Sequence, residues 1–394
     1  MTKLEQLIEE LCPNGVKYYT LNSICNVYDG THQTPQYTES GIKFASVENI
    51  ADPYATEKYI SVSDYEKYKI KPQRNDLLMT RIGSIGVCTV LESDEPLAYY
   101  VSLALLRPNN EVLNSRYLKY AIESLHCRKE LRKRTLVNAV PIKINMGDIG
   151  KITLPVPPLP VQNEIVRILD NFTELTAELT AELTARKKQY EYYTEQLMNF
   201  GECVKMISLG EIGSVKMCKR ILKSQTNTTG GIPFYKIGTF GKESDAFISE
   251  EVFEEYKEKY SYPKKGDILI SCSGTIGRTV VFDGEPAYFQ DSNIVWLEHD
   301  GTIVTNKYLR YCYKKQPWQI STGGTIARLY NDNILKAKIP VPSIEEQERI
   351  VEILERFDIL CNDISEGLPA EIEGRRKQYE HYRDKLLTFK ELSK

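Results

Sequence analysis

The stretch IPVPSIEEQERIVEILERF, residues 339–357, decides how this chain is organised, because a close copy of it, LPVPPLPVQNEIVRILDNF, occupies residues 154–172. In both copies closely spaced prolines precede a run whose apolar residues recur at helical spacing. Proline disfavours helix at the residue before it, so the prolines predict an extended approach that hands over to a long helix. One chain therefore carries the same domain-to-helix junction twice.

The junction is one part of a longer internal repeat. RKKQYEYYTEQLMNF at residues 186–200 matches RRKQYEHYRDKLLTF at 375–389, and NDLLMTRIGSIG at 75–86 matches GDILISCSGTIG at 266–277. The offset stays between 185 and 191 residues along the chain. A period this long is too large for a solenoid, so we interpret it as a tandem duplication of a unit of roughly 190 residues.

Each unit combines a globular part with a helix. The globular part has short β-branched and aromatic runs separated by Gly, Asn and Asp turns, which predicts strands mixed with short helices. The helix of the first unit contains TELTAELTAELTA at 173–185, which spaces Leu175, Leu179 and Leu183 four residues apart. Such an apolar stripe needs a partner, and we expect the equivalent helix of the second unit to cover it.

The predicted fold class is α+β. Two similar mixed α/β domains are joined by two long antiparallel helices in a pseudo-twofold internal repeat. The expected boundaries are an N-terminal arm at 1–16, a first domain at 17–155, a first spacer helix at 156–200, a second domain at 201–340 and a second spacer helix at 341–394.

The arm resembles the region that follows the first spacer helix, since LEQLIEELCPNGVKYYTL at 4–21 is similar to EQLMNFGECVKMISL at 195–209. It could dock beside the C-terminal helix and complete the symmetry of the repeat. A plain amphipathic N-terminal helix explains the same residues equally well.

Composition and motifs exclude several classes of protein. The sequence lacks a long apolar run and a signal peptide, and its nine cysteines are scattered among only four histidines. These features predict a cytoplasmic protein without disulfides or a zinc site. No glycine-rich cofactor turn, phosphate-binding loop, nucleophile elbow or metalloprotease motif is present, so we expect no catalytic residues, no bound metal and no cofactor.

Charge is unevenly distributed although the net charge is only −3. Residues 126–143 contain six basic residues against Glu130, and residues 201–240 contain six against two acidic ones. Residues 344–373 contain ten acidic residues against two arginines. A phosphate backbone would be attracted to the first two regions and repelled by the third, although a charge run alone is often just a solvated surface.

The duplicated motifs together resemble a known family. The junction with EEQERIVEIL, the segment GDILISCSGTIGR, the polar loop DGTHQTP at 29–35 and the TAEL tetrads are similar to the specificity subunit of type I restriction-modification systems, over nearly the whole chain. The first copy departs from the common pattern at Met79 and at Cys88 and Thr89.

The resemblance implies a non-catalytic subunit. Each globular part would be a target recognition domain that reads one half of a split, asymmetric DNA sequence. The helices would space the two halves and dock two methyltransferase subunits, which carry S-adenosylmethionine, and restriction subunits would join the complex.

The resemblance also suggests which residues contact DNA. Polar side chains beside the duplicated glycine turns are candidates, namely Thr80, Ser84, Ser273 and Thr275. Side chains suited to reading base edges are Arg81, Asn138 and Lys143 in the first domain and Arg278 and Arg328 in the second. The remaining cations are expected on phosphates, which position the protein without specifying sequence: Arg128, Arg132, Lys133, Arg134, Lys216, Lys219 and Arg220.

Two alternatives remain open at the level of sequence. A coiled-coil scaffold would use the helices to join two protein-binding domains, and a DNA-binding protein outside restriction-modification would use the same basic regions. An enzyme acting alone is disfavoured by the missing motifs.

Overall fold

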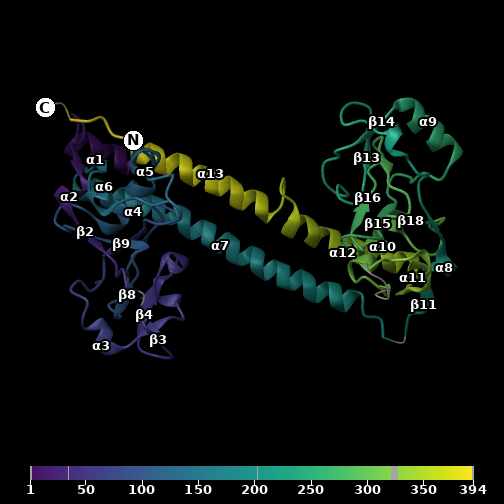
Figure 1. Cartoon of the computed structure of the whole chain (residues 1–394), viewed down its shortest axis with the longest axis horizontal. Helices are drawn as coiled ribbons and strands as arrows, with labels where there is room; N and C mark the ends of the chain where they lie inside the picture. The colour runs from purple at the N-terminus through teal and green to yellow at the C-terminus, as the bar shows by residue number, and fades with distance from the viewer. Residues whose placement is uncertain (1, 34, 202, 321–326, 393–394) are drawn as a thin grey trace. The chain divides into compact units, whose positions relative to one another are not determined.

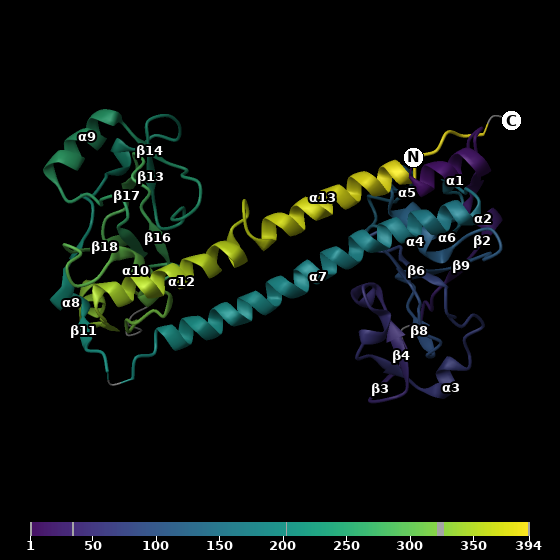
Figure 2. The ribbon, with the colours of Figure 1, turned by 180° about the vertical axis from the view of Figure 1, so that it is seen from behind.

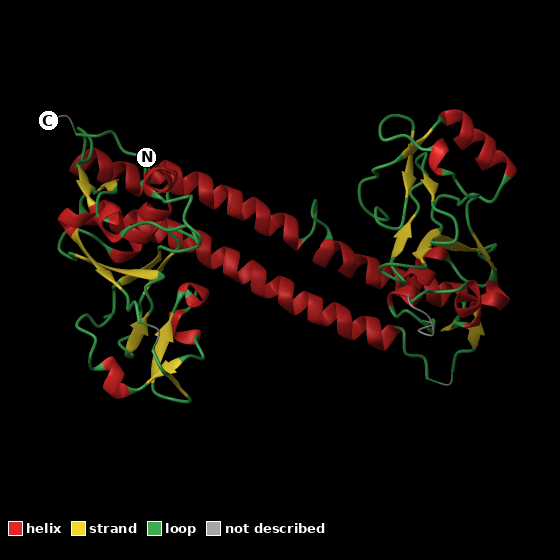
Figure 3. Cartoon of the chain, viewed as in Figure 1, coloured by secondary structure: helices red, strands yellow, loops and turns green. Residues whose placement is uncertain are grey.

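The structure, a computed structural model, describes residues 2–33, 35–201, 203–320 and 327–392. The chain divides into two compact units. Unit 1 comprises Met1–Ala181 with Ala370–Lys394, and unit 2 comprises Glu182–Pro369. Both units mix strands and helices (Figure 3). The boundaries fall inside helices rather than at the predicted domain edges, because each unit includes parts of two spacer helices.

Unit 1 is built on two four-stranded sheets (Figure 1). The first sheet has the order β2-β9-β6-β7 and is antiparallel throughout, and the second has the order β3-β5-β4-β8 with β4 and β8 parallel. A third, two-stranded sheet pairs β1 with β10. The strands are β1 Tyr18–Thr20, β2 Cys25–Asp29, β3 Tyr37–Thr38, β4 Ile42–Ala45, β5 Tyr59–Ile60, β6 Leu77–Thr80, β7 Cys88–Val90, β8 Leu97–Tyr99, β9 Leu103–Pro108 and β10 Thr153–Pro155.

The helices of unit 1 contribute to the same core as its first sheet. Apolar faces of α1, α4 and α5 meet the start of α7 and the C-terminal segment in one buried cluster. The helices are α1 Lys3–Leu11, α2 Leu21–Ile24, α3 Val62–Tyr65, α4 Ser115–Glu123, α5 Leu125–Arg134, α6 Met146–Ile149 and α7 Leu159–Leu197, with α13 Leu368–Leu386 returning near the end of the chain.

Unit 2 repeats this plan (Figure 2). Its main sheet has the order β12-β18-β15-β16, a smaller sheet has the order β14-β13-β17, and β11 pairs with β19 as β1 does with β10. Helix α10 packs on α12 and on β15. The elements are β11 Met206–Ser208, α8 Leu209–Ile212, β12 Ser214–Lys216, β13 Ile232–Tyr235, β14 Phe247–Ile248, α9 Glu250–Lys259, β15 Ile268–Ser271, β16 Thr279–Val281, β17 Tyr288–Phe289, β18 Ile294–Glu298, α10 Asn306–Lys314, α11 Asn331–Lys336, β19 Lys338–Pro340 and α12 Ile344–Asn362.

The repeated junction is held by one buried glutamine in each unit. Gln162 is fully buried; its Oε1 accepts the N–H of Asn114 at 2.9 Å, and its Nε2 donates to the carbonyls of Val112 (2.8 Å) and Pro157 (2.7 Å). A single side chain thus ties the proline-rich approach and the start of α4 to the first turn of α7.

Gln347 makes the equivalent contacts in unit 2. Its Oε1 accepts the N–H of Thr305 at 2.9 Å, and its Nε2 donates to the carbonyls of Ile303 (2.9 Å) and Pro342 (3.0 Å). The side chain is again fully buried. The internal repeat predicted from the sequence therefore extends to individual hydrogen bonds.

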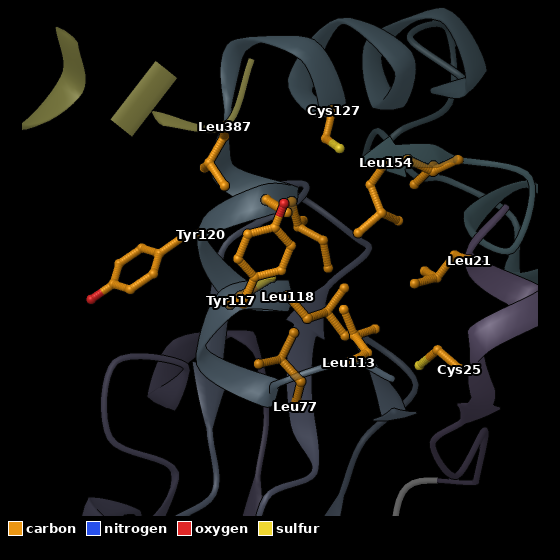
Figure 4. Close-up of a cluster of buried hydrophobic side chains, with 14 of the residues drawn as sticks. Leu21, Cys25, Leu77, Leu113, Tyr117, Leu118, Tyr120, Cys127, Leu154 and Leu387 are labelled. Atoms are coloured by element: carbon orange, nitrogen blue, oxygen red, sulfur yellow. The ribbon is translucent and has the colours of Figure 1, made fainter. Parts of the chain in front are cut away.

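The N-terminal arm docks on the C-terminal segment, as one of the two alternatives predicted. The Val16 N–H donates to the Lys390 carbonyl at 2.8 Å, and the Tyr18 hydroxyl donates to the Phe389 carbonyl at 3.0 Å. Leu387 points into the core of unit 1 beside Tyr117 and Leu118 (Figure 4). The end of the chain takes the place in unit 1 that the end of α7 takes in unit 2, where Met198 enters the core.

The second spacer helix differs from the prediction, since it is not one helix over 341–394. Residues 363–367 separate α12 from α13, whereas α7 is continuous over 39 residues. The Asp363 carboxylate accepts the N–H groups of Ser365 (2.7 Å) and Glu366 (3.1 Å), which caps the turn. The leucine stripe is also less covered than expected, because Leu175 in unit 1 remains 37% exposed.

Among the described residues, no helix is long and apolar enough to cross a lipid bilayer. All nine cysteines are free thiols.

Candidate nucleic-acid interface

The glycine turn after β6 forms the centre of the candidate surface in unit 1. The Gly86 N–H donates to the Thr80 carbonyl, and the Val87 N–H donates to the Thr80 hydroxyl at 3.1 Å. Gly86 has φ +84°, and a Cβ there would lie 2.7 Å from the Leu131 side chain of α5. Glycine at this position therefore lets the turn close against α5, and Ser84 is left exposed at its tip.

Arg81 is buried, which is contrary to its expected role as a base-reading side chain. Its exposed fraction is 7%, its Nε donates to the Val101 carbonyl at 2.9 Å and its Nη1 donates to the Ile144 carbonyl at 3.1 Å. Its Nη2 lies 3.3 Å from the Asp29 carboxylate. Arg81 therefore joins the polar loop at 29–35 to residue 144, and it positions loops rather than contacting bases.

Thr80 needs the same correction. It is fully buried and its hydroxyl is occupied by the Val87 N–H, so it supports the turn and does not face a ligand. In the 29–35 loop, His32 contacts the Asp29 carboxylate at 2.8 Å; Thr34 lies outside the described residues.

The cations of α5 fall into two groups. Lys133 and Arg134 contact the Glu130 carboxylate at 3.0 and 2.6 Å, and their hydrogen bonds hold the pKa of Glu130 below its usual range. Arg128 and Arg132 are exposed and form no close ion pair within the described residues, although the charge of Arg128 acts on the Glu123 carboxyl. Arg128 and Arg132 could therefore bind an anionic ligand without breaking an ion pair.

Asn138 and Lys143 lie on the loop that follows α5. Both side chains are exposed. This loop, residues 136–143, is bonded to the glycine turn, because the Gly83 N–H donates to the Ile142 carbonyl at 2.9 Å. The structure therefore brings together the 29–35 loop, the glycine turn and the 136–143 loop, which are far apart in sequence.

The glycine turn of unit 2 has the same construction. The buried Ser271 hydroxyl donates to the Thr275 carbonyl and accepts the Arg278 N–H. Gly274 and Gly277 have positive φ, so glycine at these positions serves the tight turn. Thr275 and Arg278 are exposed, and the Arg278 side chain has only a long 3.5 Å contact with the Gly241 carbonyl.

Three other candidates of unit 2 converge on the loop at residues 291–293. Arg220 donates to the Asp291 carboxylate (2.9 Å), Arg328 to the Ser292 carbonyl (2.8 Å) and Ser273 to the Asn293 side chain (2.8 Å). By the internal repeat, Ser292 corresponds to Val101, the residue whose carbonyl accepts from Arg81. An arginine from a different element thus anchors the same carbonyl position in each unit.

The last two candidates are partly engaged. Lys216 lies 3.5 Å from Glu298, and the Lys219 ammonium stands 5.0 Å above the Tyr260 ring. The segment STGGTI at 321–326, which aligns with most of the 136–143 loop, lies outside the described residues.

Some features of the surface are not found from the sequence. The roles of Asp29 and of residues 291–293 depend on contacts between distant segments and leave no local pattern. Lys129 is exposed on α5 beside the cations predicted to contact phosphates. It belongs to the same basic run, so the sequence pattern would have justified predicting it as a phosphate contact too.

The fold and the surfaces define a class of protein: a chain with two copies of one mixed α/β unit, each presenting polar and cationic loops anchored by a buried network. The family described as the type I restriction modification DNA specificity domain matches residues 13–186 and 202–374. The chain belongs to this family and carries two copies of its domain.

Curated relatives agree with this assignment. A putative type I restriction enzyme specificity subunit of Haemophilus influenzae is 56% identical over 287 residues, which cover 71% of this chain and 73% of that protein. The EcoR124I/EcoR124II specificity subunit of Escherichia coli is 39% identical over 258 residues, which cover 61% and 63%.

Solved structures share the fold. The S subunit of the type I restriction-modification system from M. genitalium aligns with a TM-score of 0.54 at 16% identity, over 98% of this chain and 99% of that one. A chain from a structure of type I restriction-modification complex assembly aligns with a TM-score of 0.61 at 16% identity, over 96% and 98%. The chain is a type I DNA specificity subunit, and the scaffold alternative is not supported.

Proposed function

We propose that the chain reads a bipartite, asymmetric double-stranded DNA target, with one half read by each unit. The observation that carries this proposal is that the two units share buried anchors but differ in sequence at the segment that aligns with the 136–143 loop. Residues 136–143 are LVNAVPIK, whereas the aligned residues 321–328 are STGGTIAR. Two different readers on one chain select two different half-sites.

Exposure and existing partners rank the proposed contacts. Side chains that are exposed and have no ion pair among the described residues can meet DNA without breaking an ion pair: Ser84, Arg128, Arg132, Asn138, Lys143, Thr275 and Arg278. Lys133, Arg134, Lys216, Lys219, Arg220 and Arg328 would have to exchange a present contact for a phosphate. Ser273 has the same limitation, because its hydroxyl is already bonded to Asn293.

The chemistry is assigned to partner subunits. Two methyltransferase subunits would bind along the helices and supply S-adenosylmethionine and catalysis, and restriction subunits would complete the complex in the cytoplasm. The chain itself would be non-catalytic. The acidic exposed side chains of α12 suit a protein partner better than DNA, since phosphates would be repelled by them.

The decisive experiment is a genome-wide map of adenine methylation in the host, with and without this gene. Loss of methylation at one split, asymmetric motif is the expected result, and it identifies the target directly. An unchanged map in a strain that expresses the methyltransferase partners would contradict the proposal.

The spacing of the two half-sites has its own test. One TAEL tetrad inserted after Leu183 lengthens α7 by about 6 Å. Since base pairs rise by about 3.4 Å, the spacer should grow by about one or two base pairs while both half-sites stay the same.

A matched control is four residues of Gly-Ser inserted between Ile364 and Ser365, where α12 and α13 are already interrupted. Ile364 is exposed, so the added residues can loop out and the spacer should not change. An unaltered spacer after the α7 insertion would defeat the ruler mechanism.

A further inference from the structure

Four apolar side chains are exposed on the 136–143 loop of unit 1. Leu136, Val137 and Ile142 are between 39% and 63% exposed, and Val140 is 99% exposed. Single exposed apolar residues are ordinary, but four within seven residues form a local apolar surface. Nothing in the contacts described above uses these side chains.

The loop is held as a narrow hairpin. The Leu136 N–H donates to the Lys143 carbonyl at 2.8 Å, and residues 136 and 143 form an antiparallel bridge. Residue 143 also bridges Ile82 of the glycine turn, and Arg81 binds the carbonyl of Ile144 at the base of the loop. Because both ends are fixed, Val140 is presented at the tip on a backbone anchored to the core.

The surroundings of the loop favour DNA as its occupant over another protein. It directly follows α5, whose Arg128 and Arg132 are exposed and form no close ion pair with any described residue, and Lys143 closes it. Unpaired cations around a protein–protein contact would be desolvated without compensation, whereas phosphates flanking a base contact would neutralise them.

We propose that the 136–143 loop is an apolar reading hairpin that enters the major groove and sets the side chain of Val140 against the C5-methyl group of a thymine. The major groove admits a two-stranded ribbon, and the thymine methyl is the apolar group that a base pair presents there. This inference rests on the proposed function. It adds Val140 as a specificity-determining residue, which a search for charged or hydrogen-bonding side chains does not identify.

The test deletes methyl groups on each side of the contact. The full-length chain, assembled with its methyltransferase partners, is titrated onto its mapped target as wild type and as Val140→Ala. Each thymine of the first half-site is replaced in turn by deoxyuridine, which lacks only the C5-methyl. Val112→Ala is the matched control, since Val112 is an exposed valine outside the hairpin and only its backbone carbonyl, which the substitution keeps, bonds to Gln162.

Val140→Ala should weaken binding by about 4- to 15-fold, as expected for losing the burial of one or two methyl groups. The slope of log affinity against log salt should not change, because no phosphate contact is lost. One uracil position should weaken the wild type and leave Val140→Ala unaffected. The melting temperature should stay at the wild-type value, because a 99% exposed side chain supports no packing.

Wild-type affinity in Val140→Ala would overturn the inference. Weaker binding without any uracil-sensitive position, or a first half-site without thymine in either strand, would overturn it too. A wild-type complex without sequence preference would contradict the proposed function, and the inference with it. That outcome is distinguishable from failure of the inference alone, because it is seen in the wild type without any variant.

Discussion

Replacing the junction glutamines with alanine should destabilise the two units separately. In Gln347→Ala three hydrogen bonds are lost, and the Thr305 N–H and the carbonyls of Ile303 and Pro342 lose a partner at a fully buried site. At about 1 kcal/mol for each bond, the free energy of unfolding of unit 2 should fall by about 3 kcal/mol. With a urea slope of about 2.5 kcal/mol per M, the midpoint should drop by roughly 1.2 M.

The sequence provides a reporter for one unit only. Trp296 and Trp318 are the only tryptophans of the chain, and both are buried in unit 2. Tryptophan fluorescence therefore follows the unfolding of unit 2, while far-ultraviolet circular dichroism follows both units. Gln347→Ala should shift the fluorescence transition. Gln162→Ala should leave the fluorescence transition unchanged and shift the part of the dichroism transition that comes from unit 1.

Gln196→Ala is the matched control, because Gln196 is exposed near the end of α7 and its side chain makes no described bond. Its midpoint should stay within about 0.2 M of the wild type, as is usual for surface substitutions. A shift below about 0.3 M in Gln347→Ala would refute the role given to the glutamine. An equal fluorescence shift in Gln162→Ala would show that the units unfold as one.

Three further outcomes are expected. Arg81→Ala should lower the free energy of unfolding by about 1–3 kcal/mol and speed hydrogen exchange over residues 136–144, because the buried donor that holds the Ile144 carbonyl at the base of that loop is lost. Arg132→Ala should leave exchange there unchanged. Arg132→Ala should weaken binding to all DNA sequences and reduce the salt slope by about 1, with a smaller effect in Lys133→Ala because Glu130 already engages that ammonium. Glu123→Gln should raise the melting temperature at neutral pH and lose that advantage in acid.

The sign of the Glu123 prediction follows from burial. Burial raises the pKa of the Glu123 carboxyl above its usual range, although Lys119, Arg128 and Arg383 oppose the shift. The folded state therefore binds this proton more tightly than the unfolded chain does. Stability is fully retained below the unfolded pKa and decreases as pH rises through the folded pKa, so only the ionised form carries a penalty that glutamine removes. A melting-temperature gain that persists in acid would contradict this account.

Much of the architecture was predictable because its signals are local or repeated. The prolines at 155–160 and 340–342 mark the junctions, helical periodicity marks α7 and α12, and the duplication fixes which segments correspond. The docking of the arm on the C-terminal segment was one of two interpretations that the same duplication left open. These features require no knowledge of contacts between distant residues.

The site was less predictable, because side-chain exposure depends on such contacts. An arginine at a strand end next to glycine is ordinarily exposed, but Arg81 meets Asp29, 52 residues away, and Ile144, 63 residues away. The apolar hairpin was missed for a related reason: valine and leucine predict burial, and only the structure shows that residues 136–142 leave the core. The charge pattern identified the basic residues of α5. It did not indicate that two of them, Lys133 and Arg134, form ion pairs with Glu130.

The interruption at residues 363–367 accounts for an asymmetry visible in the sequence. Between the junction phenylalanine and the following arginine cluster, the second copy has 17 residues (358–374) and the first has 13 (173–185). Four extra residues in a continuous helix would rotate everything after them by about 40°. The break removes that constraint, because a turn capped by Asp363 absorbs the surplus. An equivalent stacked aromatic pair then forms in each unit. Phe172 of α7 stacks with Tyr382 of α13 in unit 1, and Phe357 of α12 stacks with Tyr190 of α7 in unit 2. Under the proposed ruler mechanism, the spacer length would therefore be set by the uninterrupted helix α7, to which each added tetrad contributes, whereas the interruption between α12 and α13 would accommodate a difference in length.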